Sequence, residues 1–385
     1  MKKALVCGAG KVGRGFLAQL LHRSGFLVYF LDSDPRVVDL LNASKSYRVN
    51  IAGAADESET IPVEQAYTPD DRVAVGALLR EVDLVFSCVG ARNLDPVSNF
   101  LAPLLAERDE VIDWLICENA HDPAATIRSV IDRIGGDVAR RLSAKRLGLV
   151  ETQVLRSVGE VDLGTGGELD VTGSNWWTLP ADGDAFVGTP PEIIGLEPKA
   201  NFAAELIRKI YTFNGLNGPL AYFGYANGYR ILHEAARAPE LQPFVREIQE
   251  ESAHGLVREF GFEENEHREF QALAFKKYRD TGFVDTLERH ARDSARKLGP
   301  EERLLGPARL CLKHGREPVA YARAIAAAIS YDGSNDPGTQ SVQETLRKGG
   351  VRLVLREISS CAEGASLCEL IESAWNGRSY LVGRA

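Results

Sequence analysis

The first half of the chain alternates short apolar runs with segments of helical periodicity. Residues 4–7 are all apolar, as in a strand buried on both faces of a sheet. A second apolar run covers residues 26–31. Between these runs, four apolar side chains recur at helical spacing: Phe16, Leu17, Leu20 and Leu21. Later runs predict a helix around 99–105 and strands at 82–90, 113–119, 147–154 and 167–173. This alternation predicts an α/β fold with a mostly parallel sheet.

The second half of the chain has a different pattern. From about residue 198 to the end, apolar residues follow helical periodicity, which predicts a mostly α-helical domain. Residues 178–195, rich in Pro, Gly and Asp, have the composition of a connecting loop. We therefore expect a sheet-containing domain over residues 1–195 and a mostly helical domain over residues 196–385. The length of 385 residues also favours two domains.

Composition and charge exclude several classes of function. Hydrophobic residues make up 44% of the chain and charged residues 26%, which is typical of a globular protein. The formal net charge of −9 disfavours nucleic acid and anionic membranes as partners, because these require concentrated Lys and Arg. No run approaches about 20 apolar residues, so we expect no membrane span. A small anionic ligand is still possible, since it needs only a local cationic pocket.

The cysteine and histidine patterns predict a reduced, cytoplasmic protein without a metal site. None of the six cysteines forms a C-x-x-C pair, and Cys7, Cys88 and Cys117 lie in apolar runs, as buried free thiols do. The histidines form neither H-x-x-x-H nor H-E-x-x-H. The N-terminal run is basic and then apolar, but glycines interrupt it after a few residues. We interpret it as a strand rather than a signal peptide.

A glycine-rich turn follows the first apolar run. The sequence GAGKVG fits G-x-G-x-x-G. In such a motif, Gly8 allows a tight turn, Gly10 lets the backbone approach a pyrophosphate, and Gly13 lets the helix pack close to the strand. Lys11 and Val12 lie at the helix N-terminus, where free N–H groups and the helix dipole attract phosphates. The pattern predicts a dinucleotide site, with a purely structural glycine turn as the alternative.

Residues that follow later strands extend this expected site. Asp32 follows the second strand at about the interval of 20 residues that the motif requires, and its carboxylate would accept from ribose hydroxyls and repel a 2′-phosphate. We therefore expect NAD as the cofactor, while Arg36 leaves NADP as an alternative. Ligands bind at the carboxyl ends of parallel strands, so Gly90 is predicted beside the cofactor and Asn119 at the reacting centre. The alternative for Asn119 is a turn or cap residue.

The run KIYTFNGLNG contains three polar residues among apolar and aromatic neighbours: Lys209, Asn214 and Asn217. On an α-helix, Lys209 and Asn217 lie about 80° apart, and Asn217 and Asn214 about 60° apart, so all three share one broad face. One interpretation is a solvated helix face. The other is a partly buried site in which desolvation lowers the pKa of the lysine, so that it serves as an acid or base. The Asn N–H groups would then stabilise an alkoxide or polarise a carbonyl.

A cluster of basic residues lies at positions 289–297. Arg289, Arg292 and Arg296 would fall within about 60° of one another on a helix, which favours an anionic ligand such as a sugar phosphate between them. The alternative is local pairing with the neighbouring acids Glu288 and Asp293.

Several segments occur together in a known family. In chain order they are GAGKVGRGF (8–16), SYRV (46–49), VDLVFSCVG (82–90), CEN (117–119), K-x-x-x-x-N (209–214), AYFG (221–224) and RKLGPEERLLGP (296–307). They are spread over nearly the whole chain. In this combination the sequence resembles the polyol-specific long-chain dehydrogenases, and within them the mannitol-1-phosphate 5-dehydrogenases.

The resemblance implies a Rossmann-type, doubly wound domain, a mostly helical second domain, and metal-independent hydride transfer between NAD and a polyol or its ketose. It implies that Lys209 is the general acid–base and that Asn119 and Asn214 stabilise the oxyanion. It assigns substrate binding to Arg289 and Lys297, which match substrate-binding positions of the family, and with it Arg292 and Arg296 become reasonable ligands of a phosphate.

Two positions depart from the family pattern. Asn217 occupies a position where the family has a histidine, so it becomes a changed substrate contact that cannot carry a proton. Leu155 stands where an aspartate is usual, while Arg156 is kept.

We expect a sugar alcohol phosphate and a ketose phosphate as substrates, by analogy mannitol 1-phosphate and fructose 6-phosphate. We expect a monomer or a weak homodimer. One alternative is the same chemistry on an unphosphorylated polyol or a hexuronate. Another, motivated by the two departures from the family pattern, is a non-catalytic NAD-binding protein.

Overall fold

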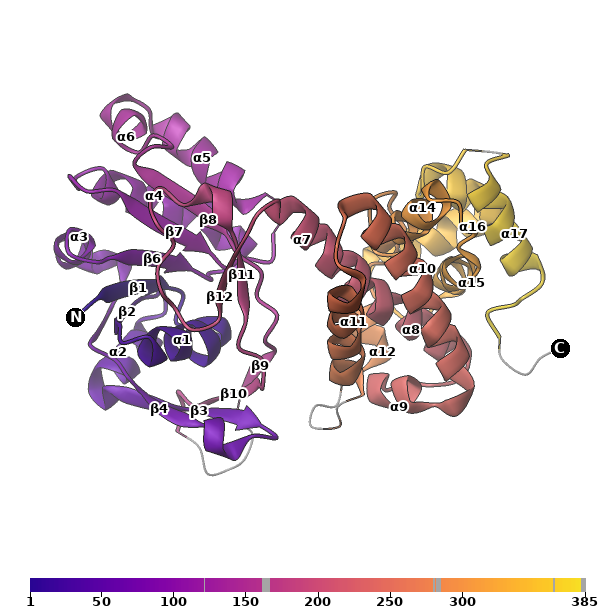
Figure 1. Ribbon diagram of the computed structural model, residues 1–385, viewed down its shortest axis with the longest axis horizontal. Helices are drawn as coiled ribbons and strands as arrows, with labels where there is room; N and C mark the ends of the chain where they lie inside the picture. The colour runs from indigo at the N-terminus through magenta and orange to yellow at the C-terminus, as the bar shows by residue number, and fades with distance from the viewer. Residues whose placement is uncertain (121, 161–166, 280, 282–284, 363, 382–385) are drawn as a thin grey trace. The chain divides into compact units, whose positions relative to one another are not determined.

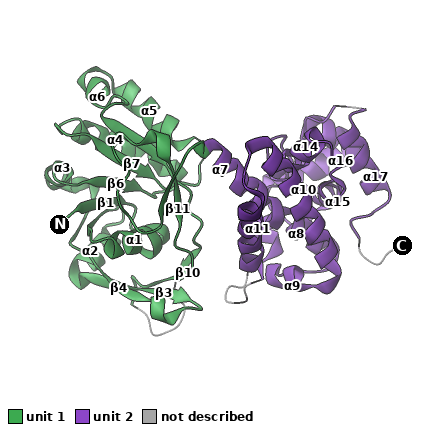
Figure 2. Ribbon diagram, in the orientation of Figure 1, with its two compact units in different colours: residues 1–202 green, residues 203–385 purple. Residues whose placement is uncertain are grey.

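The computed structural model describes residues 1–120, 122–160, 167–279, 281, 285–362 and 364–381 (Figure 1). The chain divides into two compact units, Met1–Phe202 and Ala203–Ala385 (Figure 2). Over the described ranges, no helix combines the length and the apolar character needed to cross a membrane.

The first unit is built on a six-stranded parallel sheet in the order β5-β2-β1-β6-β7-β8. The strands are β1 (Lys3–Cys7), β2 (Leu27–Leu31), β5 (Gln65–Tyr67), β6 (Leu84–Ser87), β7 (Ile112–Ile116) and β8 (Leu147–Glu151). The chain first adds strands on one side of β1 and then on the other, so the order reverses between β1 and β6. In such a doubly wound sheet, ligands bind beyond the carboxyl ends of the strands at this switch point. The predicted fold class is confirmed.

Helices cover both faces of this sheet (Figure 1). They are α1 (Ala18–Arg23), α2 (Pro35–Ser44), α3 (Arg72–Leu79), α4 (Leu94–Leu105), α5 (Pro123–Ile134) and α6 (Gly136–Arg141). Successive residues of β1 point to opposite faces: Val6 packs in one apolar core with residues of α1 and α2, and Leu5 packs in another with residues of α3, α4 and α5. Two cores on one parallel sheet explain why its strands are continuously apolar.

Two smaller sheets complete the first unit. One has the order β4-β3-β10-β9, and the other pairs β11 with β12 in parallel. Their strands are β3 (Ser46–Ala52), β4 (Glu59–Pro62), β9 (Val158–Glu160), β10 (Val171–Ser174), β11 (Leu179–Asp182) and β12 (Leu196–Lys199). The interpretation of residues 178–195 as a plain loop is therefore wrong, because β11 lies within it. The strand expected at 167–173 corresponds to β10, which belongs to the four-stranded sheet and pairs with β3 in parallel.

The second unit is helical, as its periodicity predicted. Its helices are α7 (Phe202–Lys209), α8 (Gly215–Ala226), α9 (Leu232–Arg237), α10 (Gln242–Phe260), α11 (Glu264–Tyr278), α12 (Leu287–Ala291), α13 (Ser294–Lys297), α14 (Leu305–Lys313), α15 (Val319–Ser330), α16 (Pro337–Glu357) and α17 (Ser366–Asn376). Helix α8 is buried all round from Gly215 to Gly224. A helix without a solvent face lies in the core, so polar residues on α8 need a structural or a chemical reason.

The cysteines follow the prediction in part. Cys7, Cys88 and Cys117 are free thiols, as expected. Cys361, in the segment after α16, and Cys368, in α17, form a disulfide, so the expectation of a wholly reduced chain is wrong for this pair. No motif indicated this pair, because the two residues are separated by seven positions and form no C-x-x-C motif.

Candidate active site

The glycine turn after β1 has the geometry that a dinucleotide requires. Gly8 has φ +100°, and a Cβ there would lie 2.7 Å from the carbonyl oxygen of Cys88. A Cβ on Gly13 would lie 2.0 Å from the carbonyl oxygen of Gly8, so only glycine permits this close packing. A Cβ on Gly10, by contrast, would meet no atom within 4 Å. The residues of the turn therefore fit NAD, because the backbone at Gly10 is open to a pyrophosphate.

The helix after this turn begins at Lys11 and Val12 and continues into a π turn at Gly13–Leu17 before α1. The N–H of Arg14 donates to the carbonyl oxygen of Gly10 at 3.0 Å. The predicted helix is present, but Gly13–Leu17 have π rather than α geometry. Such turns are rare and frequently occur at functional sites.

Asp32 supports the glycine turn directly. Its carboxylate accepts from the backbone N–H of Ala9 at 2.6 Å and from that of Asp34 at 2.9 Å. The first bond links the end of β2 to the turn after β1. Each carboxylate oxygen has a second lone pair, so both retain the capacity to accept from ribose hydroxyls.

Gly90 and Asn119 lie beyond the ends of two neighbouring strands, and both are exposed. Glu118 joins the two segments, because its carboxylate accepts from the N–H groups of Val89 at 2.7 Å and Gly90 at 2.9 Å. Burial raises the pKa of Glu118, and these two backbone bonds oppose the rise. Sequence reasoning missed Glu118; the available signal was an acid directly before Asn119 at a strand end.

Arg156 is hydrogen-bonded to the helix that follows the glycine turn. It is 4% exposed and donates to the backbone carbonyls of Gly15 at 3.0 Å and Trp176 at 2.7 Å. Its guanidinium lies 4.3 Å from the ring of Trp177, and Arg23 lies 3.9 Å from the same ring. Burial, and then the charge of Arg23, lower the pKa of Arg156 to about 10. Trp177 therefore makes cation–π contacts with two arginines, Arg23 at the end of α1 and Arg156.

In the second unit, a π turn separates α7 from α8. Lys209 is the last residue of α7, residues Ile210–Asn214 form the π turn, and α8 starts at Gly215. The expected angles between the polar side chains assumed an uninterrupted α-helix, so they are wrong. A π turn closes its hydrogen bonds between residues five apart, which is the spacing of Lys209 and Asn214.

Lys209 is partly buried, and its side-chain ammonium makes no hydrogen bond or ion pair with any residue that the structure describes. Burial, and then the positive charge of Arg303, lower its pKa. A lysine in this environment carries the neutral, basic form at a lower pH than a solvated one.

Asn217 is 8% exposed, so the solvated-face interpretation is wrong for this residue. Its Nδ2 donates to the hydroxyl of Tyr278 at 3.4 Å, and that hydroxyl donates to the carbonyl oxygen of Phe213 at 3.0 Å. Its Oδ1 is buried and has no hydrogen-bond partner among the described residues. The amide is therefore oriented with an unused acceptor. Asn214, on the π turn, is partly exposed.

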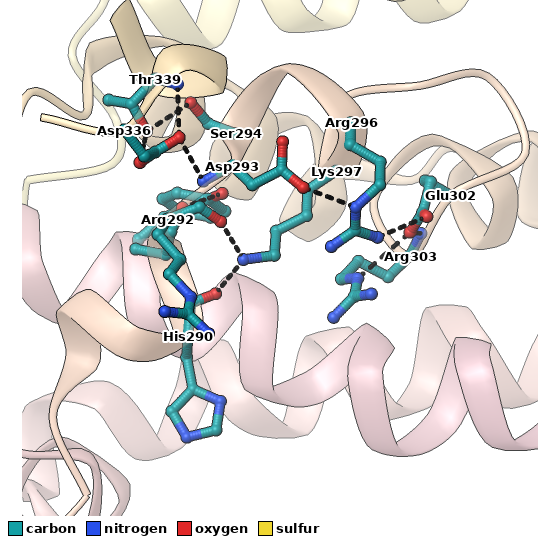
Figure 3. Close-up of polar contacts among 12 residues, drawn as sticks. His290, Arg292, Asp293, Ser294, Arg296, Lys297, Glu302, Arg303, Asp336 and Thr339 are labelled. Atoms are coloured by element: carbon teal, nitrogen blue, oxygen red, sulfur yellow. Dashed lines mark hydrogen bonds and ion pairs between the residues drawn. The ribbon is translucent and has the colours of Figure 1, made fainter. Parts of the chain in front are cut away.

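The basic cluster does not lie on one helix (Figure 3). Helix α12 ends at Ala291, Arg292 is extended with ψ 156°, and Asp293 has the left-handed φ of 61° before α13 begins. The expectation of three arginines aligned on one helical face is therefore wrong. Asp293 tolerates this conformation better than most residues because its side chain is short and polar.

Local carboxylates bind two of these arginines. Arg289 contacts Asp285 at 3.1 Å, and Arg296 contacts Asp293 at 2.6 Å and Glu302 at 2.8 Å. The pairing interpretation is thus correct in kind for these two, although the partners differ from those expected. Arg292 is exposed.

Lys297 lies inside the cluster and is 4% exposed. Its Nζ donates to the carbonyl oxygens of His290, at 2.7 Å, and Arg292 (Figure 3). Burial, and then the charges of Arg303 and Arg296, lower its pKa to about 7.

Sequence reasoning missed two cations of the second unit. Arg303 lies within the run RKLGPEERLLGP, which carried a signal, and its charge acts on both Lys209 and Lys297. Lys277 had no sequence signal. Burial, and then the charge of Lys209, lower its pKa to about 8. In the described part of the chain, no group of three His, Cys, Asp or Glu side chains could hold a metal ion.

Comparison with known families covers both units. Residues 2–195 match the mannitol dehydrogenase Rossmann domain, and residues 204–372 match the mannitol dehydrogenase C-terminal domain. The chain belongs to the mannitol dehydrogenase family. This membership confirms the predicted dehydrogenase class, the Rossmann-type domain and NAD as the cofactor at the level of the family.

Within the mannitol dehydrogenase family, the chain resembles curated relatives over nearly its full length. It is 31% identical over 375 residues to the mannitol-1-phosphate 5-dehydrogenase of Bacillus licheniformis, covering 96% of this chain and 98% of the relative. It is 28% identical over 372 residues to the enzyme of the same name from Thermoanaerobacter pseudethanolicus, covering 95% of each.

Solved structures share the fold at low sequence identity. Substrate-free D-sorbitol dehydrogenase has a TM-score of 0.81 at 12% identity, over 97% of this chain and 92% of that one. Mannitol 2-dehydrogenase of Pseudomonas fluorescens, in a complex with NAD and D-mannitol, has a TM-score of 0.67 at 14% identity, over 98% and 92%.

Proposed function

We propose that the chain interconverts a sugar alcohol phosphate and a ketose phosphate with NAD, and that the pair is mannitol 1-phosphate and fructose 6-phosphate. The observation that carries this proposal is Lys209, partly buried, without a described partner, and with a pKa lowered by burial and by Arg303. The two curated relatives are named mannitol-1-phosphate 5-dehydrogenases, which supports the choice of substrates.

The first unit is proposed to bind the nucleotide. The turn at Gly8, Gly10 and Gly13, with the N–H groups at Lys11 and Val12, receives the pyrophosphate, and Asp32 accepts from the ribose. Bound NAD would accept the hydride in oxidation and supply it in reduction. The N–H of Gly90 donates to Glu118, and a Cβ on Gly90 would meet no atom within 4 Å, so the backbone there has open space for the nucleotide.

The second unit is proposed to carry the proton transfer. In oxidation, neutral Lys209 takes the proton of the substrate hydroxyl; in reduction, protonated Lys209 returns it to the ketose oxygen. Asn214 donates an N–H group to this oxygen as negative charge develops, and the family resemblance assigns the same role to Asn119. Asn217 accepts from another substrate hydroxyl through its unused Oδ1, because a buried acceptor without a partner is unfavourable. Four basic residues remain the proposed ligands of the rest of the substrate: Arg289, Arg292, Arg296 and Lys297.

The first test is NADH oxidation by the purified protein with fructose 6-phosphate, and with fructose alongside. Turnover with the phosphate is expected, and Lys209→Ala should reduce the rate of hydride transfer about 10²–10⁴-fold. NADH binding by Lys209→Ala, measured by fluorescence titration, should be unchanged and so controls for folding. An unchanged rate of hydride transfer in Lys209→Ala would contradict the proposed role.

The same assay decides between the alternatives. Turnover of fructose or a ketouronate in place of fructose 6-phosphate would support an unphosphorylated polyol or hexuronate as the substrate. Binding of NADH without oxidation of any sugar in the panel would support the non-catalytic interpretation, with Asn217 and Leu155 as the residues to replace first.

A further inference from the structure

Three side-chain hydroxyls hold the π turn between α7 and α8. Each donates to a backbone carbonyl oxygen in the turn or directly after it, at 2.9, 3.0 and 3.0 Å. The donor and acceptor pairs are Ser252 with Tyr211, Tyr278 with Phe213, and Tyr321 with Gly215. The donors lie on α10, α11 and α15, all within the second unit. The turn between Lys209 and α8 is therefore held from three helices as well as by its own backbone.

The hydroxyl of Tyr278 has a second contact, with the side chain of Asn217. Nδ2 of Asn217 donates to it at 3.4 Å, which is long for an N–H···O bond, so the contact matters for the orientation of the amide more than for its energy. Both residues are enclosed, with Tyr278 6% exposed and Asn217 8% exposed. Phe270, earlier on α11, packs edge-on against Phe213 with ring centres 5.0 Å apart. This face of α11 is therefore fixed against the π turn at two points.

The single proton of the Tyr278 hydroxyl decides how the amide of Asn217 is oriented. Tyr278 donates this proton to the carbonyl oxygen of Phe213, which can only accept. The same hydroxyl can then only accept from Asn217, so it faces Nδ2 and not Oδ1. Burial raises the pKa of Tyr278, so the hydroxyl keeps its proton at neutral pH. The opposite orientation of the amide would place two acceptors together, which is unfavourable inside a protein.

The acceptor atom of Asn217 is consequently the one that is not used by Tyr278. Oδ1 is buried and has no hydrogen-bond partner among the described residues. A buried acceptor without a partner is unfavourable, and a ligand hydroxyl that donates to it removes this cost. A ligand atom that only accepts cannot do so, because Oδ1 carries no proton. The pair of Tyr278 and Asn217 therefore distinguishes donors from acceptors.

We propose that Tyr278 is a positioning residue that fixes Asn217 as a hydrogen-bond acceptor, so that the site selects sugars with a donating hydroxyl opposite Oδ1. The inference rests on the proposed function, in which Asn217 contacts the substrate, and adds the polarity of that contact. Tyr278 acts through the amide and touches neither substrate nor cofactor. A histidine at position 217 could donate or accept according to its tautomer, whereas Asn217 held by Tyr278 has one role.

Substrate analogues measure the polarity of this contact. Monodeoxy analogues of fructose 6-phosphate locate the hydroxyl, because its loss should lower kcat/KM about 10- to 100-fold in the wild type and less than about threefold in Asn217→Leu. The analogue with fluorine at that position can accept but not donate, so the wild type should reject it about as strongly as the deoxy analogue. If every analogue is rejected equally by the wild type and Asn217→Leu, Asn217 receives no substrate hydroxyl and the inference is overturned.

Tyr278→Phe tests the positioning role. Without the hydroxyl, the amide of Asn217 can turn Nδ2 toward the fluorine, so the preference for the parent sugar over the fluoro analogue should fall at least about fivefold. Tyr321→Phe is the matched control, because it also removes a hydroxyl bond to a backbone carbonyl of this region, that of Gly215. The control should keep the wild-type preference. A Tyr278→Phe variant that loses rate by the same factor on both sugars would show a purely structural role and overturn the inference.

A double-mutant cycle tests whether Tyr278 acts through Asn217. In the Asn217→Leu background, Tyr278→Phe should change the preference by less than about twofold, because the amide that it orients is absent. A further fall in the double variant would indicate direct contact between Tyr278 and the substrate and would overturn the positioning role. If the protein reduces a different ketose, the analogues of that ketose are used, so the proposed substrate can be wrong while the inference holds. A protein that reduces no sugar would overturn both.

Discussion

Replacing Arg156 by methionine should destabilise the first unit. Arg156 donates to the carbonyls of Gly15 and Trp176 and to Oε1 of Gln19, at 3.0, 2.7 and 2.6 Å. Methionine keeps much of the apolar volume of the side chain but donates no hydrogen bond, so three acceptors lose their partner. Gly15 and Gln19 are themselves buried, so water cannot easily replace the guanidinium at either of these two.

The magnitude follows from two opposing terms. Leaving the two buried acceptors unsatisfied costs about 1–3 kcal/mol each, and losing the bond to the partly exposed carbonyl of Trp176 costs about 1 kcal/mol, or about 5 kcal/mol in total. Removing the buried cation recovers its desolvation cost. The fall of its pKa from 12.5 to about 10 corresponds to about 3 kcal/mol. The expected net loss is about 2 kcal/mol, which is a large fraction of the typical stability of about 5–15 kcal/mol.

The assay is urea unfolding followed by tryptophan fluorescence. The matched control is Arg23→Met, which also contacts the Trp177 ring but whose ion pairs to partly exposed Glu57 and Glu59 should contribute only about 1 kcal/mol. If Arg156→Met destabilises the protein by less than about 1 kcal/mol, or no more than Arg23→Met, the reasoning from buried acceptors is refuted.

Three further predictions concern the proposed site. Gly10→Ala should weaken NADH binding at least about tenfold and change the free energy of unfolding by less than about 0.5 kcal/mol. Gly13→Ala should also destabilise the fold, because a Cβ at Gly13 meets another atom closely and a Cβ at Gly10 does not. The rate of polyol oxidation should rise as the pH passes through the lowered pKa of Lys209, and the rate of ketose reduction should fall over the same pH range. Arg303→Gln removes one cause of the lowered pKa, so it should move both pH profiles to higher pH. Asn217→Leu should reduce kcat/KM for the preferred ketose about 10- to 100-fold while NADH binding, measured by titration, is retained.

The nucleotide half of the molecule was predictable because its signals are local. The strand, glycine turn, helix, strand and acid lie within the first 32 residues, and each pattern depends on neighbours in sequence. The support that Glu118 gives to Gly90 was not predictable in the same way, since it joins two strands that become neighbours only in the folded sheet. The pairing of β3 with β10 is non-local for the same reason.

The second half shows where helical periodicity fails as a guide. Apolar spacing predicted helices around Lys209 and Arg292, but it carries no information about where the backbone hydrogen bonds change. The left-handed conformation of Asp293 ends the alignment of the arginines. The place of Lys277 beside Lys209 depends on the packing of α11 against α8, which no single segment encodes.

The two π turns have a consequence for comparing lengths among related chains. A π turn is equivalent to one extra residue accommodated within an α-helix. Deleting a single residue between 210 and 214 would leave a sequence that still forms a helix, yet everything beyond the deletion would rotate by about 100° relative to Lys209. Asn217 would then face a different neighbour although its own sequence context is unchanged. Between α7 and α8, a one-residue gap in an alignment therefore changes which side chains lie beside Lys209, and not only the length of the helix.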